Sequence, residues 1–168
     1  RLGDDVVDRA VGEQVDRAAT QTGWDWIASK PYNTVNVDDM IWNQLMTAPD
    51  GFRKRAALAL TEIFVVSATD IGSNWPDYMM AQYWDTLVRG VTGNFRQLLE
   101  EVTLNPAMGY YLNTRGNQKE NAQGRQPDEN YAREVMQLMS IGLYQLNADG
   151  TLRTGADGAP LDTYTLDD

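Results

Sequence analysis

Apolar residues recur at intervals of three and four along most of this chain, and that spacing limits the fold more than any other feature. A clear example is the run Met79, Met80, Tyr83, Trp84, Leu87 and Val88. Side chains spaced in this way share one face of an α-helix. Asn, Gly and Pro separate such runs, and these residue types commonly begin and end helices. The pattern therefore predicts an all-α fold, that is, a mostly α-helical, bundle-like domain.

The apolar runs predict a series of helices. We expect them over residues 4–19, 40–46, 52–67, 76–90, 95–104, 106–112 and 128–142. The stretch 20–37 has no helical period and is expected to be a loop. The helix over 52–67 is apolar nearly all round, which predicts that it is the central one.

Residues with known preferences for helix ends mark several of these boundaries. Asp38 or Asp39 is expected to cap the second helix, Asn94 to open the fifth, and Pro106 to be the first residue of the sixth. The helix over 52–67 instead begins with three basic residues, which are unfavourable at the positive end of a helix dipole. We therefore expect a carboxylate to face this helix start, with a bound phosphate or sulfate as the alternative.

The last part of the chain is expected to be less regular. Residues 113–126 are polar and predict a surface loop. Two short apolar stretches, 143–146 and 151–153, flank Asp149-Gly150, which is typical of a hairpin turn. A calcium loop is less favoured, because Gln145 and Ala156 stand where acidic ligands belong. We expect one small β-hairpin near the C-terminus.

The length of 168 residues fits one domain, and we expect a single helical domain over 1–168. Within it, residues 1–37 are expected to be a less regular lead-in of helix and loop. Thr165 and Asp168 have the spacing of a capping box that no helix follows. We therefore expect the chain to be the N-terminal portion of a larger domain.

The composition excludes several kinds of chemistry. A net charge of −10 opposes binding to nucleic acid or to anionic membranes. The chain has no Cys and no His, which excludes thiolate and imidazole groups as nucleophiles or metal ligands. No apolar run approaches the roughly 20 residues that span a bilayer. We expect no nucleic-acid partner, no membrane span, no metal and no cofactor.

The helix expected from Asp128 concentrates the polar groups that could form a site. Glu134 and Glu129 are the candidate catalytic acid and base, and Asn130, Arg133 and Asp128 are the candidate ligand-binding residues. The same residues also fit a scaffold, in which Glu129 and Arg133 pair four positions apart on the helix surface. The scaffold is the favoured interpretation, because structural ion pairs resemble sites in sequence.

Several motifs, taken in order, resemble one bacterial family. They are Arg55-Ala56-Ala57-Leu58-Ala59-Leu60, Gly93-Asn94-Phe95-Arg96, Asn105-Pro106-Ala107-Met108-Gly109, Glu129-Asn130-Tyr131-Ala132-Arg133-Glu134 and Tyr164-Thr165-Leu166-Asp167-Asp168. Over roughly Met40 to Asp168 the chain resembles the bacterial Domain of Unknown Function 1800 family. The resemblance implies a longer, exported protein, periplasmic or extracellular, that is often encoded beside sulfatase-like proteins.

Two functions stay open. The favoured one is an exported helical binding or assembly module, whose aromatic side chains pack against the missing C-terminal portion of the protein or a sulfatase-like partner. The alternative is a carboxylate-based hydrolase that uses Glu134 and Glu129. The five Trp residues and the Met79-Met80 pair could form an aromatic binding face, but their helical spacing favours a place in the core.

Overall fold

The computed structural model describes residues 21–31 and 36–165 of the chain. The chain divides into two compact units, residues 1–115 and 116–168. The helix expected over 4–19 lies outside the described residues. The expectation of a single domain over 1–168 stays a prediction.

The described residues are mostly helical, which confirms the predicted helical class. They contain seven α-helices: α2 (Gly23–Ala28), α3 (Val37–Thr47), α4 (Gly51–Thr61), α5 (Pro76–Gly90), α6 (Phe95–Thr103), α7 (Pro106–Tyr111) and α8 (Asn130–Gln137). A short 3-10 helix, η1 (Ala68–Asp70), precedes α5. Within the described ranges, no helix combines the length and the apolar character that crossing a bilayer requires.

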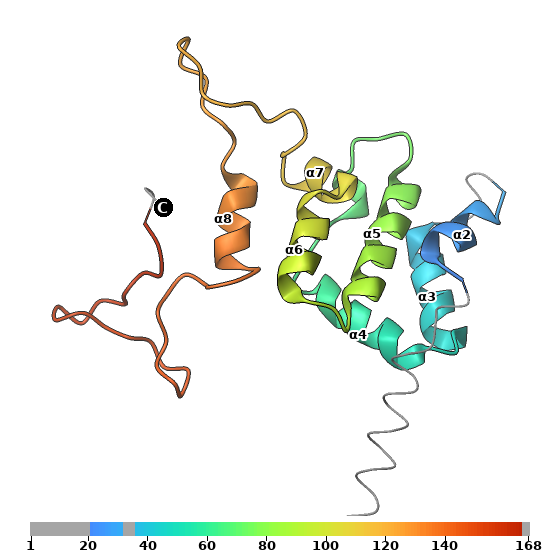
Figure 1. Cartoon of the computed structure of the whole chain (residues 1–168), viewed down its shortest axis with the longest axis horizontal. Coiled ribbons are helices and arrows are strands. Elements are labelled where there is room, and N and C mark those ends of the chain that lie inside the picture. The colour runs from blue at the N-terminus through green and yellow to red at the C-terminus, as the bar shows by residue number, and fades with distance from the viewer. Residues whose placement is uncertain (1–20, 32–35, 166–168) are drawn as a thin grey trace, which may run out of the picture. The chain divides into compact units, whose positions relative to one another are not determined.

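Helix α5 is the centre of the first unit. Helices α2, α3, α4, α6 and α7 all contact it, and so does η1 (Figure 1). Its residues 83–88 are all buried, and Tyr83, Trp84 and Leu87 are among the largest fully buried side chains. Burying a large apolar side chain stabilises a fold by about 1.5–3 kcal/mol. Helix α5 therefore carries a large share of the core.

The prediction that the helix over 52–67 is central is wrong. Helix α4 ends at Thr61 and buries few of its side chains. Three β-branched residues occur within the next five positions, and such residues are less favourable in a helix. Phe64 in this non-helical segment is nevertheless fully buried, and its carbonyl oxygen accepts a hydrogen bond of 2.7 Å from the Tyr83 hydroxyl. Phe64 therefore packs into the core from irregular chain, whereas its neighbours Ile63 and Val65 stay exposed.

Side chains at the helix starts explain several boundaries. Asn94 is the N-cap of α6, as predicted, and Pro106 is the first residue of α7, as predicted. The cap expected for α3 at Asp38 or Asp39 is wrong, because Asn36 is the N-cap. Asp39 completes a capping box with it, so its carboxylate bonds back to the Asn36 N–H.

The segment 20–37, predicted to be a loop, contains helix α2. Thr22 is the N-cap of α2, and its hydroxyl oxygen accepts a bond from the Asp25 N–H at 3.0 Å. A helix of six residues is too short to display a repeating apolar pattern. The period of the sequence therefore could not reveal it.

The basic start of α4 faces a carboxylate, which confirms that expectation. Nζ of Lys54 lies 3.7 Å from Oδ2 of Asp50, and both side chains are almost completely buried. The neighbouring Arg53 donates from Nη1 to the carbonyl oxygen of Val88 at 3.3 Å. These contacts support the acid-paired helix start over the bound anion.

The second unit contains helix α8 between a polar loop and a set of turns. Helix α8 covers only part of the predicted helix over 128–142. Further hydrogen-bonded turns continue it as far as Gly142, whose φ is 75°. None of the residues of α8 is buried.

The predicted β-hairpin over 143–153 is wrong, because no strand forms in the described part of the second unit. Isolated antiparallel bridges take its place. Three segments are joined by a cycle of backbone hydrogen bonds of 2.8 to 2.9 Å. The N–H of Gln145 donates to the carbonyl oxygen of Leu161, that of Leu161 to Arg153, and that of Arg153 to Gln145. Each pair of segments has one bridge flanked by two backbone hydrogen bonds, as Gln145 to Leu161 and Thr163 to Leu143, and no pair extends into a ladder.

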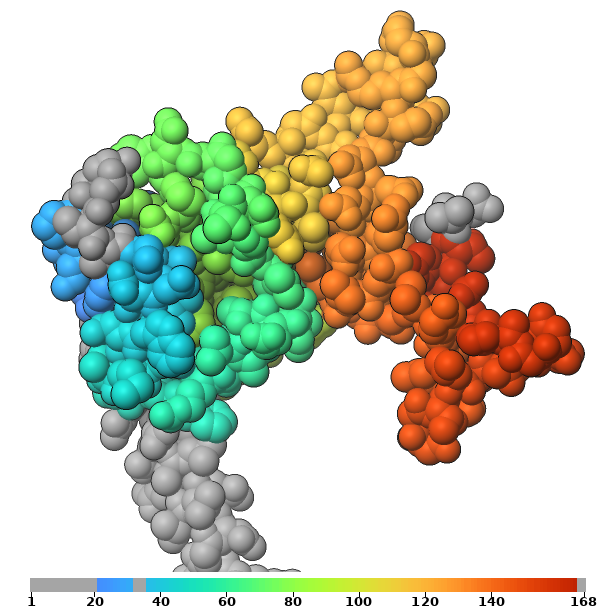
Figure 2. Space-filling view, turned by 180° about the vertical axis from the view of Figure 1, so that it is seen from behind, coloured from blue at the N-terminus to red at the C-terminus, as the bar shows by residue number. Residues whose placement is uncertain are grey.

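Two similar turns separate the three segments of this cycle. Gly150 and Gly158 have φ angles of 83° and 81°, which only Gly adopts readily. Each follows an Asp whose carboxylate accepts the backbone N–H two residues later, as Asp149 does from Thr151 at 3.0 Å. The two turns project in different directions (Figures 1 and 2). The Asp side chains thus stabilise the turns.

We expect Gly90→Ala to destabilise the first unit, because Gly90 ends α5 where α6 packs against it. A Cβ at Gly90 would lie 2.5 Å from Cδ1 of Leu98, whose side chain is buried. The clash should outweigh the better helix propensity of Ala and lower the free energy of unfolding by about 1–3 kcal/mol in urea denaturation. Gly72→Ala is the matched control, since its added Cβ meets no atom within 4 Å. A Gly90→Ala variant as stable as the wild type would contradict this packing.

Candidate functional site

Most of the polar residues predicted as a site lie at the start of α8. The carboxylate of Asp128 accepts a bond from the Asn130 N–H at 2.9 Å. Glu129 and Arg133 form the predicted ion pair, and both side chains are substantially exposed. An exposed pair on one helix contributes about 0.3–0.5 kcal/mol. These contacts fit the scaffold interpretation of this part of α8.

Glu134 has different surroundings from these residues. Its Oε2 atom is shielded from solvent and has no hydrogen-bond partner in the described part of the chain. Glu129 lies five residues earlier, which places it about 140° away around the helix axis. Gln137, one turn after Glu134, donates to the Tyr164 hydroxyl at 2.5 Å. Glu134 therefore shares a helix face with Gln137, and its pairing with Glu129 in catalysis stays a prediction.

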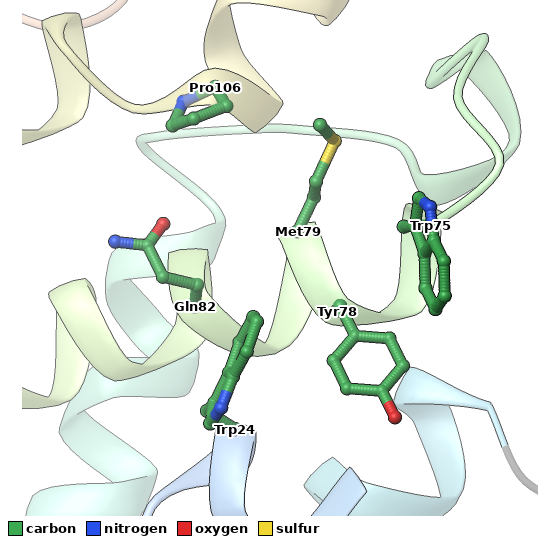
Figure 3. Close-up of a pocket in the computed structure, with 6 residues that line it drawn as sticks. All are labelled: Trp24, Trp75, Tyr78, Met79, Gln82 and Pro106. Carbon is green, nitrogen blue, oxygen red and sulfur yellow. The ribbon is translucent and has the colours of Figure 1, made fainter. Parts of the chain in front are cut away.

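The first unit carries a groove lined by aromatic and apolar side chains. The groove has a volume of about 490 Å³ and is lined by Trp24, Trp75, Tyr78, Met79, Gln82 and Pro106 (Figure 3). Four of these residues, from Trp75 to Gln82, are spaced by three and four positions on α5 and its N-cap. We call these four residues the α5 strip. Helix α2 provides Trp24 on one side of the strip, and α7 provides Pro106 on the other (Figure 3).

Tyr78 stands between two tryptophans of the groove. Its ring centroid lies 5.1 Å from that of Trp24 and 5.7 Å from that of Trp75, and both pairs meet edge to face. The two tryptophans are 47% and 54% exposed. Aromatic pairs of this kind contribute about 0.5–1.5 kcal/mol beyond the area that they bury. The three rings therefore hold one another in place while about half of each indole stays open to solvent.

A buried carboxylate on α5 fixes Trp24 at the groove. Asp85 accepts the Gly23 N–H at 2.6 Å and the Trp24 N–H at 2.9 Å, which ties the positive end of α2 to α5. Burial raises the pKa of Asp85, while the two N–H bonds and Lys54 oppose that shift. Gly23 suits this close approach, because a Cβ there would lie 3.0 Å from Met40 and 3.1 Å from Asp85. The position of one groove wall therefore depends on Asp85.

The polar end of the groove is an amide pair. Oε1 of Gln82 accepts a bond from Nδ2 of Asn105 at 2.7 Å. Asn105 in turn caps α7, accepting the Ala107 N–H at 2.9 Å. Since the oxygen of Gln82 is used in this way, its Nε2 group is a hydrogen-bond donor that the groove offers to a ligand.

The prediction that the tryptophans belong to the core holds for only some of them. Trp26 and Trp84 are buried, whereas Trp24, Trp42 and Trp75 are exposed. Spacing places a residue on a helix face but does not say what covers that face. One signal in the sequence could have indicated an exposed aromatic face. The helix over 76–90 has apolar residues on more than one face, whereas a helix that packs only against a core needs a single apolar face.

The described helices and the groove define an α-helical protein whose central helix carries an open aromatic strip. The chain belongs to the family described as "Protein of unknown function (DUF1800)", whose family model matches residues 5–168. This match confirms the resemblance and extends it to residues before Met40. No curated protein and no solved structure matches the chain.

Asp85 gives the stability of the first unit a pH dependence of known sign. Its pKa in the folded state is raised above the ordinary value of 3.8, so the folded protein keeps this proton to higher pH than the unfolded chain does. The stability contributed by Asp85 is therefore fully present below pH 3.8 and is lost as the pH rises through the raised pKa.

We expect the free energy of unfolding of the wild type to fall, relative to Asp85→Asn, as the pH rises from 3.8 through the raised pKa. Urea denaturation of both proteins at a series of pH values measures the difference. The Asn side chain has the same shape and does not titrate, although its single oxygen can accept only one of the two N–H groups. That loss does not vary with pH, so the pH dependence of the difference isolates the ionisation of Asp85. If the free energy of unfolding of the wild type instead rose with pH relative to that of Asp85→Asn, the folded state would stabilise the carboxylate, contrary to this argument.

Proposed function

We propose that the first unit is a binding module and that its groove takes the apolar face of a helix. The observation that carries the proposal is the α5 strip, which lies open between Trp24 and Pro106. An amphipathic helix presents apolar side chains at the same intervals of three and four. Such a helix matches the strip along its length.

The size and the polarity of the groove support this class of ligand. A volume of about 490 Å³ falls within the range of about 300–1,000 Å³ that is usual for binding sites. The lining is almost entirely apolar, with the amide of Gln82 as its polar group. A sugar chain would leave most of its hydroxyl groups without partners there, which is costly. The net charge of −10 disfavours an acidic ligand.

The resemblance to the family supports two sources for the helix. One is a further portion of the same protein, and the other is a sulfatase-like protein encoded nearby. We take the first as our proposal, because a segment of the same chain is present at a high effective concentration. In this proposal the protein is exported, and the module helps to assemble it in the periplasm or outside the cell.

A carboxylate-based hydrolase is the second proposal, and the shielded Oε2 of Glu134 is the observation that favours it. A carboxyl group with no hydrogen-bond partner in the described chain is available to bond with a substrate or a water molecule. In this proposal Glu134 and Glu129 exchange protons with the substrate. Asn130, Arg133 and Asp128 bind it.

We expect a helical peptide of Leu and Lys, with Leu at intervals of three and four, to bind the full chain through the groove. Trp24→Ala and Tyr78→Ala should each weaken binding at least about tenfold, since aromatic anchors dominate such interfaces. Fluorescence anisotropy of the labelled peptide measures the affinity. Trp42→Ala is the matched control, because Trp42 is 65% exposed and does not line the groove. Equal weakening by all three variants would rule out the groove as the binding site.

A peptide of the same length with Glu in place of Lys tests the charge argument. We expect it to bind at least about tenfold more weakly at low salt, with the difference shrinking as salt is added. Equal affinity of the two peptides at low salt would show that the charge of the protein does not select its partner.

We expect the wild type to hydrolyse p-nitrophenyl acetate, sulfate and glucoside no faster than Glu134→Gln does. The release of p-nitrophenol, followed by absorbance, measures each rate. A wild-type rate at least about a hundredfold above that of Glu134→Gln would instead favour the hydrolase, since a positioned acid or base contributes on this scale. Glu120→Gln, a change at an exposed position, controls for the loss of one negative charge.

A further inference from the structure

Three ionisable side chains gather away from solvent near the start of α4. Lys54 is 1% exposed, Asp50 is 0% exposed, and Asp85 is 7% exposed. Nζ of Lys54 lies 3.7 Å from Oδ2 of Asp50, four residues earlier. Asp85, on the neighbouring helix α5, interacts electrostatically with Lys54. A nucleophile, a carbonyl carbon and a second carboxyl group are thus enclosed together.

Lys54 and Asp50 are poorly satisfied as an ion pair. Within the described residues, neither oxygen of Asp50 nor Nζ of Lys54 has a hydrogen-bond partner, and 3.7 Å is longer than a hydrogen bond. A buried ion pair repays its lost hydration only when further hydrogen bonds satisfy both groups. Asp50 occupies the N-cap position of α4, yet its side chain makes no capping bond. The two charges therefore lack the contacts that would stabilise them here.

We propose that Lys54 and Asp50 are joined by an isopeptide bond between Nζ and Cγ, which the folded protein forms by itself. Positions four apart bring the two side chains together on one helix. The bond replaces two buried charges with one neutral amide, which is far less costly to bury. It also fixes the first turn of α4.

The reaction releases one water molecule and needs no other reactant. A proton first passes from the Lys54 ammonium to the Asp50 carboxylate, which leaves an amine and a carboxylic acid. The amine lone pair attacks Cγ, and the C=O electron pair moves onto oxygen. A proton then passes from the nitrogen to the hydroxyl group, which leaves as water while the C=O bond forms again. The negative charge of Asp85 stabilises the positive nitrogen before this transfer. The fold holds the amine and the carboxyl group next to each other. Their effective concentration is therefore far higher than that of a free amine and a free acid in water, which favours the attack.

The surroundings of Lys54 and Asp85 suit these steps. Burial lowers the pKa of Lys54, against the opposing effect of Asp50, which favours the neutral amine that attacks. Asp85 interacts electrostatically with Lys54, and its negative charge stabilises the positive nitrogen that the attack forms. The N–H groups of Gly23 and Trp24 hold Asp85 in place.

The intact mass of the full chain tests the bond. We expect the purified protein to be lighter than its sequence by the mass of one water molecule. Trypsin should not cut after Lys54, and fragmentation of the peptide that spans 50–54 should show the side chains linked. A protein with its full sequence mass, and a cut after Lys54, would overturn the proposal.

Loss of water from Asp50-Gly51 as a succinimide would give the same mass, and Lys54→Met separates the two reactions. We expect Lys54→Met to keep its full sequence mass. A Lys54→Met variant that still loses water at Asp50 would overturn the proposal. Fragmentation of the wild-type peptide decides the same question if this variant does not fold.

Asp50→Asn tests the bond in a second way, because it keeps the reacting carbonyl carbon but changes the leaving group. Its amide can react with Lys54 by releasing ammonia in place of water, so the linked product should have the same mass as the linked wild type. Asp85→Asn should form the bond at least about tenfold more slowly after cell-free synthesis, because it removes the negative charge that stabilises the positive nitrogen formed by the attack. Asp77→Asn, elsewhere on α5, should not slow it. Equal rates of bond formation in the wild type, Asp85→Asn and Asp77→Asn would overturn the role given to Asp85.

Discussion

Helix α5 buries six consecutive residues, from Tyr83 to Val88, and a helix that is buried all round needs a neighbour on each side. Helices α2, α3, α4, α6 and α7 provide this cover. Towards the start of α5 the burial is less complete, and residues 76–80 are only partly covered. The groove lies at this less covered end. The groove has an apolar lining because α5 continues into it. The helix that supplies the core also supplies the α5 strip.

Polar atoms inside the core connect this central helix to its neighbours. Asp85 lies in the fully buried segment and accepts the first two N–H groups of α2, which would otherwise be buried without partners. Next to it, Nε1 of Trp84 donates to Oε1 of the buried Gln44 at 2.8 Å, which joins α5 to α3. Bonds of this kind require one orientation of each helix, whereas apolar contacts tolerate several. The wall of the groove at Trp24 is therefore set by a polar contact in the core beneath it.

The features that could be predicted from the sequence act within one turn of a helix. Asn94 and Pro106 mark helix starts through their own side chains, so their positions were sufficient. Helix α2 was missed although its N-cap Thr22 is local, because six residues show no apolar period. Its first two N–H groups also bond to Asp85, which is 62 positions away from Gly23 and which no local pattern could indicate. The candidate site shows the same limit. Charged residues such as Glu134 stand out in any sequence, whereas residues of an apolar groove have the same types and the same spacing as residues of the core.

The second unit shows how local order can exist with little core, since Met139 is the one buried side chain among its described residues. Its turns are well defined, because Gly150 and Gly158 supply the positive φ angles and the preceding Asp side chains accept backbone N–H groups. Large apolar side chains stay exposed from the end of α8 to the first of these turns and just beyond it: Leu138, Ile141, Leu143, Leu146 and Leu152. Each of these side chains is 47–64% exposed and so forgoes about half of the roughly 1.5–3 kcal/mol that complete burial gives. A segment whose backbone is ordered by its own polar bonds loses little entropy when it binds. These exposed side chains therefore fit the assembly function that we propose for the first unit.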